Sequence, residues 1–332
     1  GFMLLPIFKM GGVQRRGYFQ DKYLCSNNGG IASSLPLGDP LSTHVDHNPI
    51  GDLDGSPANN YYGCIDAAKT RGPQFFCALR QMRAASAILS LAHAQAAASA
   101  EYCAWYDGAG NTNFPKGCNN DALGDTNDPE VSYTGDGYSN APKTGSGTPF
   151  AKTTDNGQPS GMADVNGGMW DVELGLTRDS GNNDFYALKE SVHPKDLTSG
   201  ENTAGGGAAT DAWGDAAHLA TLYDVLSAAH ITNAAAWSRF GNGANQVLDE
   251  AVSGNGRALT GLALPQANGE SASGTNLFGT DGLYEYWRAN LCVISGGAWS
   301  GGSIAGAWCA YLGNHRGYSR DYVGFRAACY VD

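Results

Sequence analysis

The sequence predicts an α+β fold with long irregular loops and few helices. Glycine makes up 47 of the 332 residues, about twice its usual share, and it accompanies 7 Trp and 16 Tyr. This composition indicates many tight turns around a packed aromatic core, and it excludes a disordered chain. Only two segments show a helical pattern, and the β part of the prediction rests on three motifs described below.

The clearest helix is expected over residues 74–99, where Ala and Leu dominate and Pro73 precedes the first turn. A second helix is expected over 212–229 (AWGDAAHLATLYDVLSAA). His93 lies beside the apolar stripe of the first helix. We expect it to be a core or capping histidine, because a lone histidine is a weak indication of a ligand site.

Long polar stretches separate these segments. Residues 105–165 are rich in Asn, Asp, Gly, Pro and Thr, and we expect Val131, Tyr133 and Phe150 to pin them to a core. Residues 197–211 are expected to form a flexible surface loop. Because the sequence contains no internal repeat and no clean linker, we expect a single elaborated domain over 1–332.

Charge and hydropathy exclude several classes of function. The net charge of −12 and the pI near 4.9 argue against nucleic acid as a partner, because phosphate binding needs clustered Lys and Arg. No apolar run approaches 18 residues, so no membrane-spanning helix is expected, and no signal peptide is evident at the start. The eight Cys form no C-x-x-C pair, which argues against structural zinc and leaves disulfides open.

Motifs for catalysis or metal binding are weak. The Asp-rich stretches 46–54 and 121–128 offer oxygen ligands for calcium, but neither has EF-hand spacing, so solvated turns are expected. His44 and His47 form an H-x-x-H pair that is too common to indicate a metal. No nucleophile elbow, Walker loop or dinucleotide fingerprint occurs in a helix-opening context. We therefore expect no catalytic residue, no metal and no cofactor.

The most informative segment is 286–332, which contains no Lys, Glu, Gln or Met. These four types make up 29 of the 332 residues, so about four are expected in 47. The segment is instead rich in Gly, Ser, Tyr, Arg and Asn, the residue types that binding loops use. Its net charge is +2 in a chain of −12. Composition alone leaves a binding surface and a glycine-rich terminal hairpin equally open.

Three motifs, in order along the chain, resemble those of one family. Residues 17–27 (GYFQDKYLCSN) look like its opening strand, and 163–171 (ADVNGGMWD) look like its core motif. Residues 296–299 (GGAW) and 323–326 (VGFR) resemble its GGSW…GFR ending. The family is the formylglycine-generating-enzyme type of C-type lectin fold. The resemblance brackets nearly the whole chain and implies that fold.

Within that fold the chain is most similar to the variable proteins of diversity-generating retroelements. Randomisation at template adenines in Asn codons cannot produce Lys, Glu, Gln, Met or Trp at the changed sites, and the first four of these types are the ones missing from 286–332. The resemblance implies a rigid scaffold of Trp299, Gly306, Trp308, Cys309, Arg316, Gly324, Phe325 and Arg326. It implies that the variable, ligand-binding positions are Ser300, Gly301, Ser303, Ile304, Tyr311, Gly313, Asn314, His315, Gly317, Tyr318, Arg320, Asp321 and Tyr322. Tyr284, Tyr286 and Arg288 are left outside this set.

The resemblance also implies a function. A hypervariable surface would recognise an unknown protein or glycan on another cell or virus, and the protein would be displayed on a cell or virion surface. The alternative is an oxidase of the formylglycine-generating type or a related enzyme of the same fold, such as an iron sulfoxide synthase. The iron enzyme needs a cluster of three His with an H-x-x-x-E/H pattern on a helix, which the expected helices that carry His93 and His218 do not show. The oxidase needs a closely spaced pair of redox Cys. Cys292, Cys309 and Cys329 lie in the right region, but their spacing does not match. A calcium-dependent sugar-binding lectin would need an E-P-N or Q-P-D triplet, which the sequence lacks.

Overall fold

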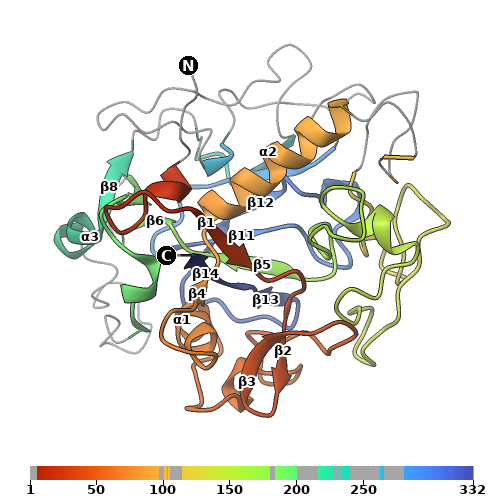
Figure 1. The fold of residues 1–332 in the computed structure, drawn as a ribbon, viewed down its shortest axis with the longest axis horizontal. Helices are drawn as coiled ribbons and strands as arrows, with labels where there is room; N and C mark the ends of the chain where they lie inside the picture. The colour runs from red at the N-terminus through yellow and green to blue at the C-terminus, as the bar shows by residue number, and fades with distance from the viewer. Residues whose placement is uncertain are drawn as a thin grey trace.

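Short strands, few helices and long irregular segments make up the fold (Figure 1). The computed structural model describes residues 6–96, 101–102, 104, 114–179, 184–199, 216–226, 231, 233–239, 262–264 and 280–331. The helices within these residues are α1 (Tyr61–Lys69), α2 (Arg80–Ala96) and α3 (Ala216–Leu222). The strands are β1 (Gly17–Gln20), β2 (Cys25–Asn28), β3 (Ile31–Ser34), β4 (Phe76–Cys77), β5 (Trp170–Glu173), β6 (Leu176–Arg178), β7 (Phe185–Leu188), β8 (Tyr223–Leu226), β9 (Ala236–Arg239), β10 (Gly282–Glu285), β11 (Leu291–Ser295), β12 (Ala310–His315), β13 (Val323–Phe325) and β14 (Ala327–Val331). The expected mixture of α and β structure with few helices is confirmed.

A six-stranded sheet carries most of the C-terminal segment. Its strand order is β13-β5-β11-β12-β10-β9. The pairs β13·β5 and β10·β12 are parallel, whereas β11 runs antiparallel to both β5 and β12. Three smaller groups accompany it, in the orders β1-β14-β4, β6-β7-β8 and β2-β3.

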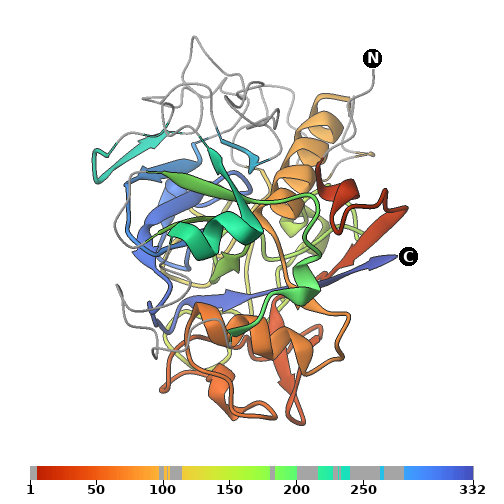
Figure 2. The same ribbon diagram turned by 90° about the vertical axis from the view of Figure 1, so that its left-hand side faces the viewer.

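Two helices cover opposite faces of the strands, and a hydrophobic core lies between each helix and the strands. Figures 1 and 2 both show α2 on one side and α1 on the other. Under α2, Ala84 and Ala87 pack with Leu283, Val293 and Leu312 of the large sheet. The opposite face contributes a second group, in which Val172, Ile294 and Phe325 share a core with Tyr61 and Ile65 of α1. The alternation of side chains along each strand therefore assigns every second residue to a different core.

The two ends of the described chain lie side by side. β1 pairs antiparallel with β14 over four residues, from Gly17 opposite Val331 to Gln20 opposite Ala328 (Figure 2). β14 also pairs with β4 through Ala327 and Cys77. The segment chosen by sequence as an opening strand is thus fixed directly to the C-terminal strand.

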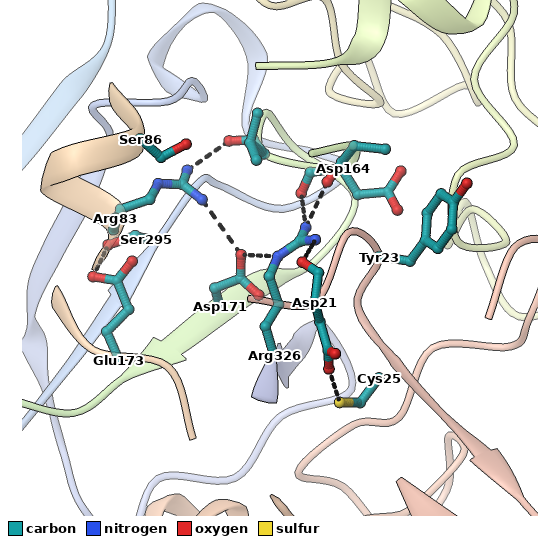
Figure 3. Close-up of polar contacts among 12 residues, drawn as sticks. Asp21, Tyr23, Cys25, Arg83, Ser86, Asp164, Asp171, Glu173, Ser295 and Arg326 are labelled. Carbon is teal, nitrogen blue, oxygen red and sulfur yellow. Dashed lines mark hydrogen bonds and ion pairs between the residues drawn. The ribbon is translucent and has the colours of Figure 1, made fainter. Parts of the chain in front are cut away.

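A buried arginine joins four distant parts of the chain (Figure 3). Arg326 is 1% exposed, and its Nε lies 3.1 Å from Oδ2 of Asp171 in β5. Its other nitrogens donate to the carbonyl oxygens of Lys22 at 2.9 Å, Ala163 at 2.7 Å and Asp164 at 2.8 Å. Burial opposes the charge on Arg326, but Asp171 and Asp164 raise its pKa overall, so the side chain stays ionised. Its expected role within the scaffold is confirmed.

Helix α2 adds two more buried arginines to this interior network. Arg83 reaches the same Asp171 oxygen at 3.4 Å and donates to the carbonyl oxygen of Val165 at 2.6 Å. Arg80 forms an ion pair with Glu173 at 3.1 Å. Figure 3 shows Ser295, which donates to the same carboxylate. We call Arg80, Arg83, Asp171, Glu173 and Arg326 the arginine frame.

Gly306 is required by a close approach. A Cβ at this position would lie 1.9 Å from Oδ1 of Asp281, far closer than van der Waals contact allows. The Asp281 carboxylate in turn accepts a hydrogen bond from the backbone N–H of Trp308 at 2.8 Å. The structure therefore explains why glycine stands just before the buried Trp308.

The polar stretch after α2 is pinned to the rest of the structure where the sequence suggested. Within its described part, 114–165, isolated bridges such as Gly124 to Ser132 and Thr154 to Ala163 replace regular strands. Val131 is buried, and Tyr133 packs on the small core that contains Trp299. The expected loop at 197–211 lies mostly outside the described residues.

Both helix predictions were too long. The expected helix over 74–99 begins only at Arg80, because Phe76–Cys77 forms strand β4 and pairs with β14. The expected helix over 212–229 is helical only over Ala216–Leu222 and then turns into strand β8, whose pairing with β7 buries Tyr223 and Leu226. In both cases sheet pairing overrides local helix propensity. Residues 97–99, 212–215 and 227–229 lie outside the described residues.

Replacing Arg326 with Met should lower the free energy of unfolding by about 3–5 kcal/mol, because the change leaves a buried carboxylate with a poorer partner. The control is Arg320→Met, an exposed arginine six residues earlier, which should change stability by about 0.5 kcal/mol or less. Urea unfolding followed by tryptophan fluorescence measures both. Equal effects of the two variants would show that the arginine frame does not hold the fold together.

Candidate ligand-binding face

Strand β12 has one side buried under α2 and an opposite, more open side, whose Tyr311 packs partly buried against the second core. Along Ala310–His315, burial alternates, so that Ala310, Leu312 and Asn314 are buried while Tyr311, Gly313 and His315 remain partly exposed. Leu312 packs under α2. Asn314 is only 6% exposed, so the expectation that it belongs to a solvent-facing surface is wrong. The period of two along a strand places it on the inner side.

Three aromatic residues form a row across the open side of the sheet. Strand register places Trp237 of β9 opposite Tyr284 of β10, and Tyr284 opposite Tyr311 of β12. The rings of Tyr284 and Tyr311 stack at 4.3 Å, and the Trp237 ring meets each of them edge-on or tilted within 5.5 Å. Trp170 of β5 closes the row from below, 6.0 Å from Tyr311. Trp237 is 41% exposed, so the row opens to solvent at its β9 end.

The segment after β12 continues this surface. The hydroxyl groups of Tyr318 and Tyr322 lie 3.0 Å apart, and the His315 ring meets the Tyr318 ring edge-on at 6.4 Å. Arg320 is exposed and lies over the Tyr318 ring, 5.0 Å from its centroid. Tyr322 contacts Trp299 edge-on at 6.0 Å. The ring contact of His315 with Tyr318 and the hydroxyl contact of Tyr318 with Tyr322 thus link the end of the strand to the following segment.

Residues 300–304 reach the other end of the same surface. Gly282 is crowded between Trp237 and Ile304, since a Cβ there would lie 2.8 Å and 3.0 Å from their side chains. Ser300 is exposed, and Gly301 and Ser303 are partly exposed within the same segment. Ile304 therefore lies beside the Trp237 end of the aromatic row.

The structure brings together a defined set of residues that we call the aromatic face. Its members are Trp237, Tyr284, Ile304, Tyr311, His315, Tyr318, Arg320 and Tyr322. Six of them come from the thirteen positions named by sequence. The positions predicted from sequence do not include Trp237 or Tyr284, because only the register of β9 and β10 places these two residues beside Tyr311.

Among the remaining predicted positions, Gly313 and Asp321 have structural roles. A Cβ at Gly313 would lie 2.5 Å from the Tyr311 ring, so glycine at this position leaves the space that the ring occupies. The Asp321 carboxylate accepts a hydrogen bond from the hydroxyl of Tyr138 at 3.0 Å and so faces partly inward. Gly317 is partly exposed at the turn after Arg316.

Two buried arginines hold the ends of the segment that carries Tyr318, Arg320 and Tyr322. Arg316 is 1% exposed and donates to Thr177 Oγ1 at 2.6 Å and to Asn290 Oδ1 at 3.1 Å. At the other end, Arg326 pairs with Asp171 within the arginine frame. The backbone between the two is thereby fixed without help from the exposed side chains.

The charge on the face is positive near neutral pH. Burial and the neighbouring Tyr284 raise the pKa of Tyr311, and burial with the Tyr322 hydrogen bond raises the pKa of Tyr318, so both phenols stay neutral. Burial and the nearby Arg288 lower the pKa of His315, which keeps its ring neutral. Arg288 and Arg320 therefore supply the charge, in contrast to the acidic chain as a whole.

The chemistry of the face suits binding better than catalysis. Tyrosine and tryptophan rings provide large contact areas at low entropy cost, and arginine adds charge and hydrogen bonds. The Cys thiols nearest to it are poor nucleophiles. Cys292 and Cys309 are buried near opposite ends of the β11–β12 pair, and burial raises the pKa of both, that of Cys292 to about 12. Among the described residues, no three His, Cys, Asp or Glu side chains group as metal ligands.

Comparison with known proteins adds little to this geometry. No family model matches the chain, and no curated protein matches it. A search of solved structures finds the Major Tropism Determinant U1 variant, with a TM-score of 0.35 and 10% sequence identity. The alignment covers 95% of this chain and 50% of that one, so this chain spans about half of its length. A TM-score of this size does not establish a shared fold. Within the described residues, no helix is long and apolar enough to cross a membrane.

Substitutions on the two sides of β12 should lower the free energy of unfolding by different amounts. Leu312→Ala should lower the free energy of unfolding by about 2–5 kcal/mol, because it leaves a cavity under α2. His315→Ala, three residues later on the open side, should cost about 1 kcal/mol or less. Thermal and urea unfolding of both variants measure the difference. A loss at His315 as large as that at Leu312 would mean that the open side is part of the core.

Proposed function

We propose that this protein is a ligand-binding display protein and that the aromatic face is its recognition surface. The observation that carries the proposal is a row of partly exposed rings, bordered by arginines, on a sheet whose other face is packed under α2. Exposed aromatic surfaces of this kind are typical of interaction sites. The proposed fold is a C-type lectin fold of the formylglycine-generating-enzyme type, formed by a single elaborated domain.

We further propose that the six members of the face within 286–332 are variable, namely Ile304, Tyr311, His315, Tyr318, Arg320 and Tyr322. The absence of Lys, Glu, Gln and Met from 286–332 is what adenine-directed diversification by a retroelement would leave. The division of labour in the structure supports this, because Trp308 and Phe325 are buried while Tyr311, His315 and Arg320 reach solvent. Variation at outward positions can change a ligand without removing the contacts that hold the backbone.

The proposed partner is a protein or glycan on another cell or virus surface, with this protein displayed on a cell or virion. A stable interface of standard size buries about 800 Å² on each partner, which requires more than the aromatic row alone. Ser300, Ser303 and Asp321 lie beside the face and would enlarge the contact. Tyr311, Tyr318 and Arg320 are the expected centres of binding energy, because Tyr and Arg dominate such sites.

A selection experiment tests the proposal without knowledge of the natural ligand. Ile304, Tyr311, His315, Tyr318, Arg320 and Tyr322 are randomised together, and the displayed library is selected on immobilised lysozyme and, separately, on streptavidin. We expect folded binders with dissociation constants of about 1 μM or below for each target. A control library of equal size randomises exposed residues outside the face, namely Val13, Phe19, Ile31, Leu37, Val45 and Leu89.

The control library should give fewer and weaker binders. If most members of the face library fail to fold, or if both libraries perform equally, the aromatic face is not a specialised recognition surface.

A further inference from the structure

His47 lies buried beneath the aromatic face with an acceptor at each ring nitrogen. Its side chain is 2% exposed. Nδ1 is 2.6 Å from the backbone carbonyl oxygen of Asp321, and Nε2 is 2.6 Å from Oδ2 of Asp136. The ring stacks on Tyr138 at 4.2 Å and meets Trp299 edge-on at 6.2 Å. The two hydrogen bonds and the two ring contacts together fix the position of the His47 ring.

These partners determine the protonation state of the ring. A carbonyl oxygen can only accept a hydrogen bond, so Nδ1 must carry a proton. The Asp136 carboxylate also accepts from Asn48 Nδ2 at 3.1 Å and, through Oδ1, from the backbone N–H of Tyr138 at 2.8 Å. The Oδ2 atom that faces Nε2 already takes part in accepting hydrogen bonds, so this contact is best satisfied when Nε2 donates as well. Contacts with an acceptor at each ring nitrogen therefore favour the doubly protonated, imidazolium form of His47.

We propose that the His47 imidazolium is a positioning residue for the aromatic face and makes its binding conformation depend on protonation. This inference rests on the proposed function of the face. His47 touches no ligand-binding side chain of the face directly. It acts through the backbone of Asp321, which lies between Arg320 and Tyr322.

The neighbouring contacts show how the effect reaches the face. Thr43 donates its backbone N–H to the Val323 carbonyl at 2.8 Å, and its Oγ1 accepts from the Arg320 N–H at 3.1 Å. Its carbonyl accepts from the hydroxyl of Ser319. The segment 43–47 thus supports 319–323 at four places, and His47 supplies the charged one.

The direction of the pH dependence follows from the charges around the ring. Burial lowers the pKa of His47, but the hydrogen bonds to Asp136 and to the Asp321 carbonyl raise it more, so the folded pKa lies above 6.5. The other titratable groups that face the ring are the Asp321 carboxylate and the Tyr138 phenol; His44 and Asp46 lie on its own segment. The stabilisation is complete below pH 6.5 and is lost as pH rises through the folded pKa. A neutral ring would turn a lone pair toward one of the two oxygens.

Two measurements on the full chain test this without any ligand. Long-range ¹H–¹⁵N spectra of ¹⁵N-histidine-labelled protein should show both His47 ring nitrogens protonated at pH 6, with assignment from the His47→Gln variant. Hydrogen exchange, corrected for intrinsic rates, should show at least a tenfold loss of protection over 319–323 between pH 6 and pH 9. His47→Gln should exchange fast at both pH values, and the control His44→Gln should behave like wild type.

A singly protonated His47 ring at pH 6, or protection over 319–323 that does not change with pH, would overturn the inference. The spectra of the wild-type protein decide the first point even if His47→Gln fails to fold.

A third measurement separates this inference from the proposed function. A lysozyme binder selected at pH 6 should lose at least tenfold in affinity at pH 9, and the loss should disappear in its His47→Gln form. If protection changes with pH but no binder can be selected, the histidine device stands and the recognition surface fails. If binders are obtained but neither their affinity nor the protection of residues 319–323 changes with pH, the recognition surface stands and the role of His47 fails.

Discussion

The structure depends on the buried contact between the Arg326 guanidinium and the Asp171 carboxylate. A charge in the interior is costly unless it is paired, so this arginine can be buried only if its partners are in place together. Those partners come from β5, from the segment before it and from the residues after β1. The pairing therefore fixes the C-terminal strands relative to both earlier parts of the chain, and Arg83 of α2 joins it through the same carboxylate.

That frame leaves the aromatic face free to differ. Arg316 and Arg326 hold the backbone from below, whereas Tyr318 and Arg320 project from the segment between them. Along β12 the same separation is made by the pleat of the strand, with Leu312 inside and His315 outside. Side chains that enter the core only in part, as those of Tyr311, Tyr318 and Tyr322 do, can change at a smaller cost to stability than fully buried ones, and this property suits a recognition site.

Much of the scaffold could be predicted from sequence, because buried Trp, Phe and Arg in a Gly-rich motif leave few options. Trp308, Phe325 and Arg326 are buried as expected. Sequence could not predict which residues of β12 face inward. Gly313 has no side chain, so it interrupts the alternation of side chains that would have placed Asn314 inside. Trp237 was missed because the pairing of β9 with β10 joins segments more than 40 residues apart. For the same reason, local composition could not show that residues 223–226 leave the helix to pair with β7.

The division between a fixed interior and a replaceable surface is tested most directly by a scan of every single substitution over 286–331. The readout is the abundance of folded protein on a display host. The division predicts broad tolerance at Tyr311, His315 and Arg320, and strong depletion at Trp308, Leu312, Arg316, Phe325 and Arg326. Tolerance at the second group, or depletion at the first as severe as in the core, would contradict the division between a fixed interior and a replaceable surface.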